Sequence, residues 1–179
     1  MNNLPIIPGE RVTLRALAVT DAPALFAVYS DDEAMTWWTH PAHATLDETK
    51  AAVASRVSTP EWRAWAITLT GDDTAIGSIA AHEKRQGGVI ELGYSLTRAH
   101  WGRGLAREAV SLLISFLFDV EGHRRIFADT DPDNARSNDL LKRLGFTLEG
   151  RLRGEWETHI GVRDSLIWGL LREEWSPPV

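Results

Sequence analysis

The chain has 179 residues, of which 44% are hydrophobic and 25% are charged, so we expect one soluble globular domain, residues 1–179, with a full hydrophobic core. The formal charge of −6 argues against a protein whose main task is to bind nucleic acid, and it suits a cationic substrate such as an amine. The absence of cysteine excludes disulfides, thiolate metal sites and a cysteine nucleophile.

The start of the chain shows no targeting signal. Residues 1–5 lack both the basic residues and the apolar run of a signal peptide. No stretch of the sequence approaches the apolar length of a membrane span. By default, these two observations predict a cytoplasmic protein without a membrane partner.

The first half of the chain predicts one strand, two helices and three consecutive strands. Residues 10–17 alternate between apolar and polar side chains, as a half-buried strand does. Two helices follow, each preceded by Thr or Asp residues that can cap it, at 21–30 and 46–58. Three strands are then expected at 64–70, 75–82 and 89–96, joined by turns at 71–73 and 86–88.

The second half predicts the order β–α–β–α–β. The long helix at 103–119 is apolar over much of its circumference, so we expect it to be buried. The other elements are a strand at 125–129, a helix at 134–144 that Gly145 ends, and strands at 146–150 and 165–171. Hairpins followed by this order predict an α+β domain with a central mixed, mostly antiparallel sheet flanked by helices.

A glycine-bearing turn joins the strand at 89–96 to the long helix. Its sequence is Trp101-Gly102-Arg103-Gly104-Leu105-Ala106. Glycines allow backbone N–H groups to converge and a helix N-terminus adds partial positive charge, so the turn predicts a phosphate or pyrophosphate site. The Lys-Ser or Lys-Thr of a P-loop is missing, and Arg107 stands where a dinucleotide fingerprint needs a small residue. The anion is therefore expected to be neither a nucleoside triphosphate nor NAD.

Asn134 and Ser137 stand at the start of the helix that follows the strand at 125–129. Asn134, or Asp133 before it, suits a helix cap, and Ser137 suits a solvated first turn. The same side chains also stand at the exit of a strand, beside the glycine-bearing turn, where they could bond an extended ligand. Both interpretations stay open on the residues alone.

Together, these segments resemble the GNAT superfamily of acetyl-CoA-dependent N-acetyltransferases. The resemblance is carried by Glu91-Leu92-Gly93-Tyr94, by Trp101–Ala106 and by Asn134-x-x-Ser137 before Leu144-Gly145-Phe146, in the family's order and spacing. Residues 11–15 and 163–168 resemble its RimJ/RimL-like branch, the ribosomal-protein N-terminal acetyltransferases. The similarity covers residues 9–173 and implies a single-domain GNAT acyl-CoA N-acyltransferase fold.

The resemblance implies acetyl-CoA as the cosubstrate and no metal. In the family, the loop matching Trp101–Ala106 wraps the pyrophosphate, although Trp101 departs from the Gln or Arg that often starts it. The strand ending near Tyr94 splays from its neighbour and pairs with the pantetheine arm, and one of its N–H groups holds the oxyanion. The implied cofactor-binding residues are Tyr94, Ser95, Leu96, Trp101, Gly102, Arg103, Gly104, Leu105, Ala106, Asn134 and Ser137.

An acceptor amine must lose a proton before it attacks, so the reaction needs a general base. Glu91 alternates with the apolar side chains of its strand, which predicts that it points into the acceptor cleft. An exposed glutamate or an ion pair with a neighbouring arginine is the competing interpretation. Leu141 excludes the tyrosine that many family members use as the acid, whereas Ser137 matches the proton donor proposed for the branch. Alternatives to Glu91 are Glu155, Glu157 and His159, in the predicted loop before the last strand.

Trp37 and Trp38 are the main candidates for contacting the acceptor. A loop rarely needs two adjacent indoles unless they face a cleft or a partner. They could form the floor of the acceptor pocket and meet an ammonium by cation–π contact, or they could pack as a simple lid. With Glu91 and Glu155, they are the predicted substrate-binding residues.

Other conspicuous residues are expected to be structural. Trp65 and Trp168 lie on predicted strands and belong to the core. His40 and His43 share a proline-containing loop without carboxylates, which is poor coordination for a metal. Asp164 matches a recurrent position of the branch and is expected in a turn or a salt bridge.

The predicted function is the transfer of acetyl from acetyl-CoA to a primary amine by direct attack, without a covalent acyl-enzyme. A protein or peptide N-terminal α-amine is the first expectation. The alternatives are a small amine (polyamine, amino acid or antibiotic) and a non-catalytic acyl-CoA-binding domain, against which Glu91 and Ser137 argue. No nucleic-acid partner is expected, and a homodimer is a partner that the branch allows.

Overall fold

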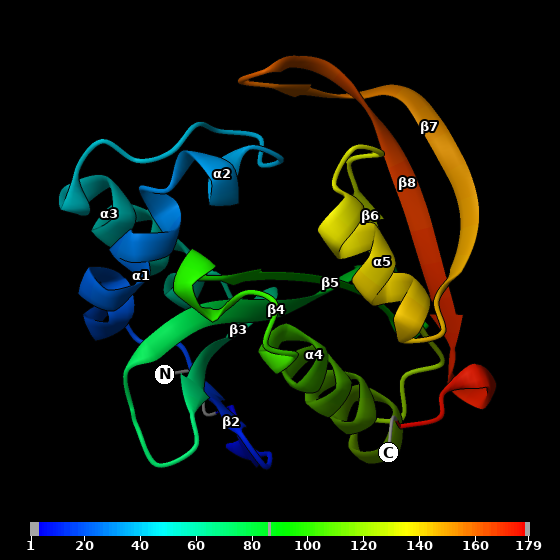
Figure 1. Cartoon of the computed structure of the whole chain (residues 1–179). Coiled ribbons are helices and arrows are strands. Elements are labelled where there is room, and N and C mark those ends of the chain that lie inside the picture. Colours follow the sequence, from blue (N-terminus) through cyan, green and yellow to red (C-terminus); the bar gives the residue numbers. More distant parts are fainter. Residues whose placement is uncertain (1–3, 86, 178–179) are drawn as a thin grey trace.

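The strands of the described chain form one mixed sheet in the order β1-β2-β3-β4-β5-β6-β8-β7 (Figure 1). The structure is a computed structural model that describes residues 4–85 and 87–177. The strands span Ile7–Pro8 (β1), Val12–Ala16 (β2), Trp62–Leu69 (β3), Ala75–Arg85 (β4), Val89–Leu96 (β5), Arg125–Thr130 (β6), Thr147–Thr158 (β7) and Gly161–Leu171 (β8). All neighbouring strands are antiparallel except β5 and β6, which are parallel. The predicted α+β fold with a mostly antiparallel sheet is therefore confirmed.

The four predicted helices begin close to the expected positions, and the short helix Asp32–Met35 was not predicted. They span Ala22–Tyr29 (α1), Asp32–Met35 (α2), Leu46–Ser58 (α3), Leu105–Ser115 (α4) and Ala135–Arg143 (α5). The N-terminus of α3 is capped by Thr45, whose hydroxyl accepts a hydrogen bond from the Glu48 amide. α4 begins two residues later than predicted because Gly104 has the left-handed φ of 77°, and a π-helical turn, Phe116–Val120, continues it. None of the helices in the described ranges is long and apolar enough to cross a membrane.

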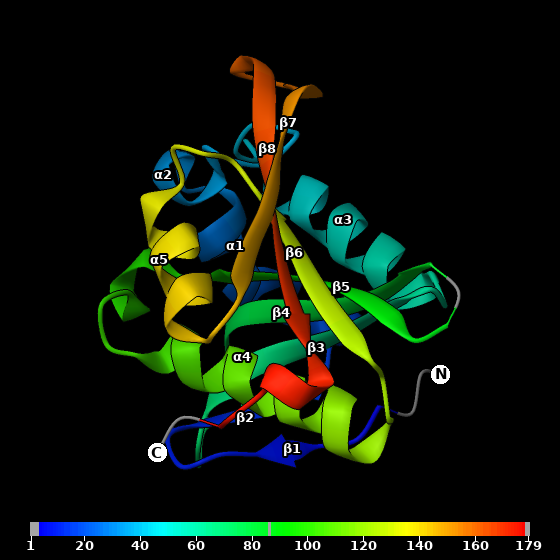
Figure 2. The same ribbon diagram turned by 90° about the vertical axis from the view of Figure 1, so that its right-hand side faces the viewer.

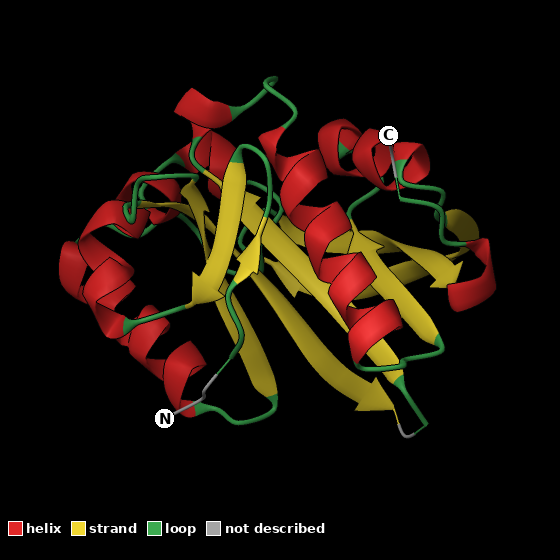
Figure 3. Ribbon diagram, turned by 90° about the horizontal axis from the view of Figure 1, so that it is seen from below, coloured by secondary structure: helices red, strands yellow, loops and turns green. Residues whose placement is uncertain are grey.

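Helices cover both faces of the sheet (Figures 2 and 3). The alternating side chains of β3 show how the two layers differ. On one face, Trp65 and Ile67 join the larger apolar cluster with α4. On the other face, Ala64 and Ala66 join a second cluster with α1 and α3. Because successive side chains of a strand point to opposite faces, the large residues fill the space under α4 and the small ones let α1 and α3 approach. Trp168 is also buried, so the predicted core tryptophans are confirmed.

The parallel strands β5 and β6 separate after a short common ladder. Their pairing runs only from Val89 with Arg125 to Glu91 with Phe127. From there β5 continues against β4, whereas β6 continues against β8. Within the described chain, no strand covers the β6-side edge of β5 beyond Glu91. The sheet thus has the open wedge that the family resemblance implied.

The last two strands are much longer than predicted. β7 and β8 form one hairpin arm, residues 147–171, which rises beyond the body of the molecule (Figure 1). Short strands with a loop at 152–163 were expected, because the alternating charges of residues 151–157 make this exposed edge strand resemble a loop. Glu155 and Glu157 therefore lie on a strand and His159 in a tight turn, which corrects the predicted loop. Of the turn predicted at 86–88, Gln86 lies outside the described residues.

Candidate active site

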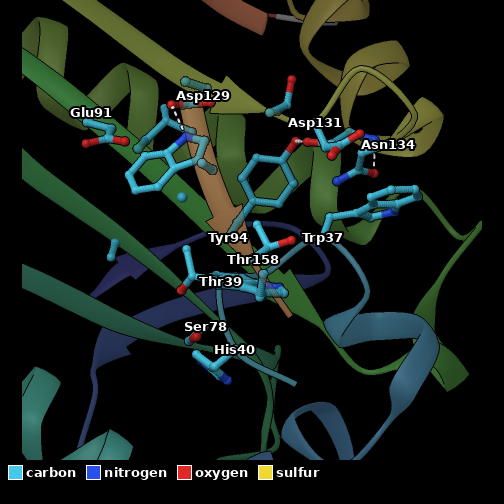
Figure 4. Close-up of a pocket in the computed structure, with 18 of the residues that line it drawn as sticks. Trp37, Thr39, His40, Ser78, Glu91, Tyr94, Asp129, Asp131, Asn134 and Thr158 are labelled. Atoms are coloured by element: carbon cyan, nitrogen blue, oxygen red, sulfur yellow. Dashed lines mark hydrogen bonds between the residues drawn. The ribbon is translucent and has the colours of Figure 1, made fainter. Parts of the chain in front are cut away.

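A cavity of about 560 Å³ lies at the wedge between β5 and β6 (Figure 4). Its walls come from the middle of β5, the end of β6, the start of α5, the loop after α2, α3 and the hairpin arm. The lining includes the predicted site residues Trp37, Trp38, Glu91, Tyr94, Asn134 and Ser137. Segments from almost the whole length of the chain therefore meet around one space.

The hydroxyl groups of Tyr94 and Ser137 meet inside this cavity. Their oxygen atoms lie 2.7 Å apart. Burial raises the pKa of Tyr94 to about 12, so its phenol stays protonated at neutral pH. A hydrogen-bonded pair of hydroxyls can pass a proton outward from either oxygen, because each is both donor and acceptor. A tyrosine is thus present beside Ser137 although the helix position usual for the family holds Leu141.

The helix-cap interpretation of Asn134 is confirmed, and its ligand-binding interpretation stays a prediction. Its side-chain oxygen accepts a hydrogen bond of 3.3 Å from the Ser137 amide, as a helix cap does. It also lines the cavity, next to the wedge between the strands. Capping fixes the side chain, so an amide group is held ready at the cavity wall.

Two carboxylates face the cavity from neighbouring strands. Glu91 is half-buried on β5 and its Oε2 atom is inaccessible to solvent. Asp129 lies near the end of β6, where it accepts a 3.0 Å hydrogen bond from the Trp156 indole and a second from the Ser165 hydroxyl. Both donors are neutral groups, so neither of these two bonds is an ion pair. Asp129 did not stand out in the sequence, although an acidic residue at the carboxyl end of a predicted strand was a usable signal.

The other acidic residues of the lining are bound to arginines. Asp131 accepts two hydrogen bonds, of 2.7 and 2.9 Å, from Arg163. Burial acts to raise the pKa of Asp131, but the bonds from Arg163 and from a backbone amide outweigh it, so that pKa lies below its usual value. Asp164 accepts from Arg151 and from the Gly154 amide, which confirms the salt-bridge interpretation. These residues shape the wall.

Aromatic side chains from two distant segments form the side of the cavity toward the arm. Trp37 and Trp38 follow α2, and Trp156 projects from β7. The Arg163 guanidinium lies 5.7 Å from the ring centre of Trp37. This indole therefore already has a cation–π contact with an arginine of the same chain. His159, at the tip of the arm, lies 3.1 Å from the Trp38 carbonyl oxygen. The tip of the hairpin arm therefore contacts the loop that carries Trp37 and Trp38.

Arg11, which forms an ion pair with Glu108 of α4, also holds the glycine-bearing turn before that helix. Arg11 lies 2.8 Å from Glu108 of α4, which also accepts a 2.7 Å bond from the Arg11 amide. The Arg11 guanidinium donates to the carbonyl oxygens of Arg103, at 2.9 Å, and Gly104, at 3.4 Å. In a trans peptide the C=O and the following N–H point in opposite directions. The N–H groups of Gly104 and Leu105 therefore face away from Arg11, toward the open side of the turn.

The backbone conformation of this turn explains why glycine stands at its two positive-φ positions. Gly102 and Gly104 have φ values of 71° and 77°, which L side chains rarely adopt. A Cβ atom on Gly104 would also lie 3.3 Å from the Arg11 guanidinium. At the start of the turn, the Trp101 indole donates a 2.8 Å bond to the Leu96 carbonyl, which ties the turn to the end of β5.

Some predicted residues lie outside the cavity lining. Glu155 is exposed on β7, and Ser95 and Leu96 continue β5 beyond the lining. The Ser95 hydroxyl lies 3.3 Å from that of Ser78, which does line the cavity. The residues Trp101–Ala106 form the separate turn at the start of α4.

Comparison with known proteins gives this geometry a family. Residues 11–147 match the acetyltransferase (GNAT) domain family. The uncharacterized N-acetyltransferase YoaA of Bacillus subtilis is 31% identical over 153 residues, 83% of this chain and 86% of that protein. The ribosomal protein uS5-alanine N-acetyltransferase of Escherichia coli is 36% identical over 92 residues, 48% of this chain and 44% of that protein, which supports the RimJ/RimL-like branch.

A solved structure agrees with the sequence matches. The probable GNAT-family acetyltransferase of Chromobacterium violaceum superposes with a TM-score of 0.88 at 28% identity, covering 97% of this chain and 90% of that one. The family match spans strands β2 to β6, the glycine-bearing turn and α5, and it ends at the start of the hairpin arm. The chain therefore belongs to the GNAT acetyltransferases and is an acetyl-CoA-dependent enzyme of that family, as its sequence resemblance predicted.

Proposed function

We propose that this enzyme acetylates the α-amine of a protein or peptide N-terminus. The observation that carries the proposal is the cavity at the wedge, where Glu91, Asp129 and the Tyr94–Ser137 pair surround one space. Acidic side chains, Glu91 and Asp129, in the cavity lining favour a cationic amine, and the partial match to the uS5-alanine enzyme supports a peptide acceptor.

The residues that would hold acetyl-CoA fit its chemistry. The Gly104 and Leu105 amides at the start of α4 suit a pyrophosphate, because convergent N–H groups and a helix N-terminus favour anions. The uncovered edge of β5 offers backbone groups to the amide-bearing pantetheine arm, and Asn134 stands beside it. Acetyl-CoA supplies the activated thioester.

Two groups of this chain would move the protons. Glu91 takes a proton from the acceptor ammonium, directly or through a water molecule, so that the amine nitrogen can attack the thioester carbonyl. The carbon–sulfur bond then breaks, and the Ser137 hydroxyl, hydrogen-bonded to Tyr94, gives its proton to the leaving sulfur. The acetylated nitrogen loses its second proton, which restores the Ser137 hydroxyl through Tyr94 or solvent, and Glu91 passes its own proton to solvent. A backbone N–H near the end of β5 stabilises the oxyanion.

Release of free CoA thiol tests the function directly. The chain has no cysteine, so a thiol reagent has no protein background. Wild-type protein is given acetyl-CoA and a panel that contains N-terminal peptides, polyamines, amino acids and aminoglycosides. Peptide-dependent thiol release supports the proposal. Release with small amines alone rejects the peptide acceptor, and acetyl-CoA binding without any release favours the binding-domain alternative.

A further inference from the structure

Arg56 is a cation in the wall of the cavity at the wedge, and it has no acidic partner within the described chain. It stands in the last turn of α3 and is half-buried. The other arginine of the lining, Arg163, lies 2.7 Å from Asp131 and also binds Asp133. By contrast, neither a hydrogen bond nor an ion pair joins Arg56 to another residue in the part of the chain that the structure describes. Its five N–H donors are therefore available to a ligand.

Two aromatic rings hold the Arg56 guanidinium in place. Its Cζ atom lies 5.5 Å from the ring centre of Tyr29, which is buried, and 5.5 Å from that of Trp38, which lines the cavity. The face of an aromatic ring attracts a cation, but it leaves the N–H groups at the edge of the guanidinium plane without acceptors. A guanidinium fixed in this way suits two parallel bonds to a carboxylate, because less freedom is lost when the carboxylate binds.

A purely structural role does not account for these donors. A cation in the last turn of a helix is favoured by the partial negative charge of that terminus, and the alkyl stem of an arginine covers apolar surface. Arg143 has the same position in the last turn of α5, yet it is exposed and lies outside the cavity lining. The helix terminus therefore gives no reason for Arg56 to stand between two rings at a cavity wall. A ligand with a negative group gives such a reason.

Arg56 belongs to the end of the cavity that adjoins β3, whereas Glu91 stands on β5. Together with Trp62 of β3, it also lines a second cavity, of about 250 Å³, so these two residues stand between the two spaces. Trp62 is opposite His82 of β4, and His82 is opposite Glu91. Two strand spacings place the backbones of Trp62 and Glu91 about 10 Å apart. An extended peptide spans that distance in about three residues, whereas the amine and the carboxylate of a free amino acid share one carbon atom.

We propose that Arg56 selects the acceptor by binding an acidic side chain at the second or third residue of the peptide. This inference rests on the proposed function and names the kind of peptide that the enzyme takes. The N-terminal amine lies toward Glu91 and Asp129, and the carboxylate binds Arg56. A polyamine is disfavoured because its second ammonium would meet this arginine. The overall charge of −6 repels acidic peptides at a distance, so a preference for them requires a local cation.

Matched peptides in the thiol-release assay test this selectivity. Each peptide begins with alanine and carries either glutamate or glutamine at its second or third position. The wild-type kcat/KM should be about tenfold higher for the glutamate peptide, the gain expected from a charge-assisted pair at a partly exposed site. Moving the glutamate to the sixth position should abolish the gain, and an equal gain there contradicts the proposal. Equal rates for glutamate and glutamine reject this inference and keep the proposed function, whereas acetylation of no peptide rejects both.

Variants of Arg56 identify the residue responsible for the preference. Arg56→Gln should reduce the tenfold ratio between the two peptides to about twofold or less, and Arg56→Lys should keep part of it. The ratio compares two peptides on one variant, so a loss of folded protein or of cosubstrate affinity cancels. The matched control Arg143→Gln changes the same residue type in the last turn of another helix and should keep the full ratio. A ratio that Arg56→Gln leaves unchanged overturns the role of Arg56.

Discussion

The turn that begins α4 and the aromatic wall of the cavity present different kinds of groups to a ligand: the turn presents backbone amides, and the wall presents side chains. The turn consists of six consecutive residues, and its carbonyl groups are fixed by Arg11 so that backbone amides face outward. The wall joins Trp37 to Trp156, which lie far apart in the chain, and presents side chains. Under the proposed function, cosubstrate binding would depend on backbone geometry, whereas acceptor choice would depend on side chains that can be exchanged without altering that geometry.

The largest expected effect is a loss of kcat on substitution of Glu91, which belongs to neither the turn nor the aromatic wall. Glu91→Gln should lower kcat by about 100-fold, because a positioned general base contributes roughly that factor. The loss should narrow as pH rises and the free amine becomes abundant in solution. The KM for acetyl-CoA should stay unchanged. Rates are measured across pH by thiol release, with Glu61→Gln, an exposed residue before β3, as the matched control. Wild-type rates at every pH would remove Glu91 from its assigned role.

Removing the Arg11 side chain should weaken the binding of acetyl-CoA at the turn before α4. Arg11→Ala leaves the Arg103 and Gly104 carbonyls without their donors, so the amides on the opposite side lose their fixed direction. The KM for acetyl-CoA should rise about tenfold, as expected for one or two hydrogen bonds, with kcat unchanged. Arg11→Lys should recover part of the affinity. A fall in kcat at constant KM would show that Arg11 acts elsewhere.

A change in the aromatic wall should alter the KM for the acceptor and leave the KM for acetyl-CoA unchanged. Trp37→Ala removes an indole from the cavity and should raise the acceptor KM by about fivefold, the size of a partly solvated aromatic contact. The KM for acetyl-CoA should not move. Steady-state kinetics with the best acceptor of the panel measures both KM values. A change in the KM for acetyl-CoA alone would contradict the separate roles of the two regions.

The smallest effect concerns pH and the ion pair under the turn. Burial acts to raise the pKa of Glu108, but the amides of Arg11 and Val12 and the Arg11 guanidinium outweigh it, so that pKa lies below 4.5. A lowered folded-state pKa means that Glu108 stabilises the fold above about pH 4.5 and loses this contribution as pH falls through the lower value. Glu108→Gln should cost about 1 kcal/mol at pH 7 and less at pH 3. Urea unfolding at both pH values measures it, and an equal cost at both would exclude ionisation as the cause.

The sequence predicted the local features of this molecule far better than the distant ones. The turn at Trp101–Ala106 could be recognised because its glycines and the following helix are consecutive. Asp129 and Trp156 could not be paired in advance, because their hydrogen bond depends on how β6 and β7 flank β8. The hairpin arm was missed because an exposed edge strand lacks the buried face that gives a strand its apolar alternation. The role of Arg11 depends on a contact with a helix almost a hundred residues away.

The short ladder between β5 and β6 has a structural consequence. One side of the sheet, β1 to β5, and the other, β6 to β8, share only the pairing that ends at Glu91 and Phe127. Among the junctions between the longer strands of the described sheet, this seam has the shortest ladder. A substrate-sized gap therefore comes from the topology itself, and no loop has to be held open to make it.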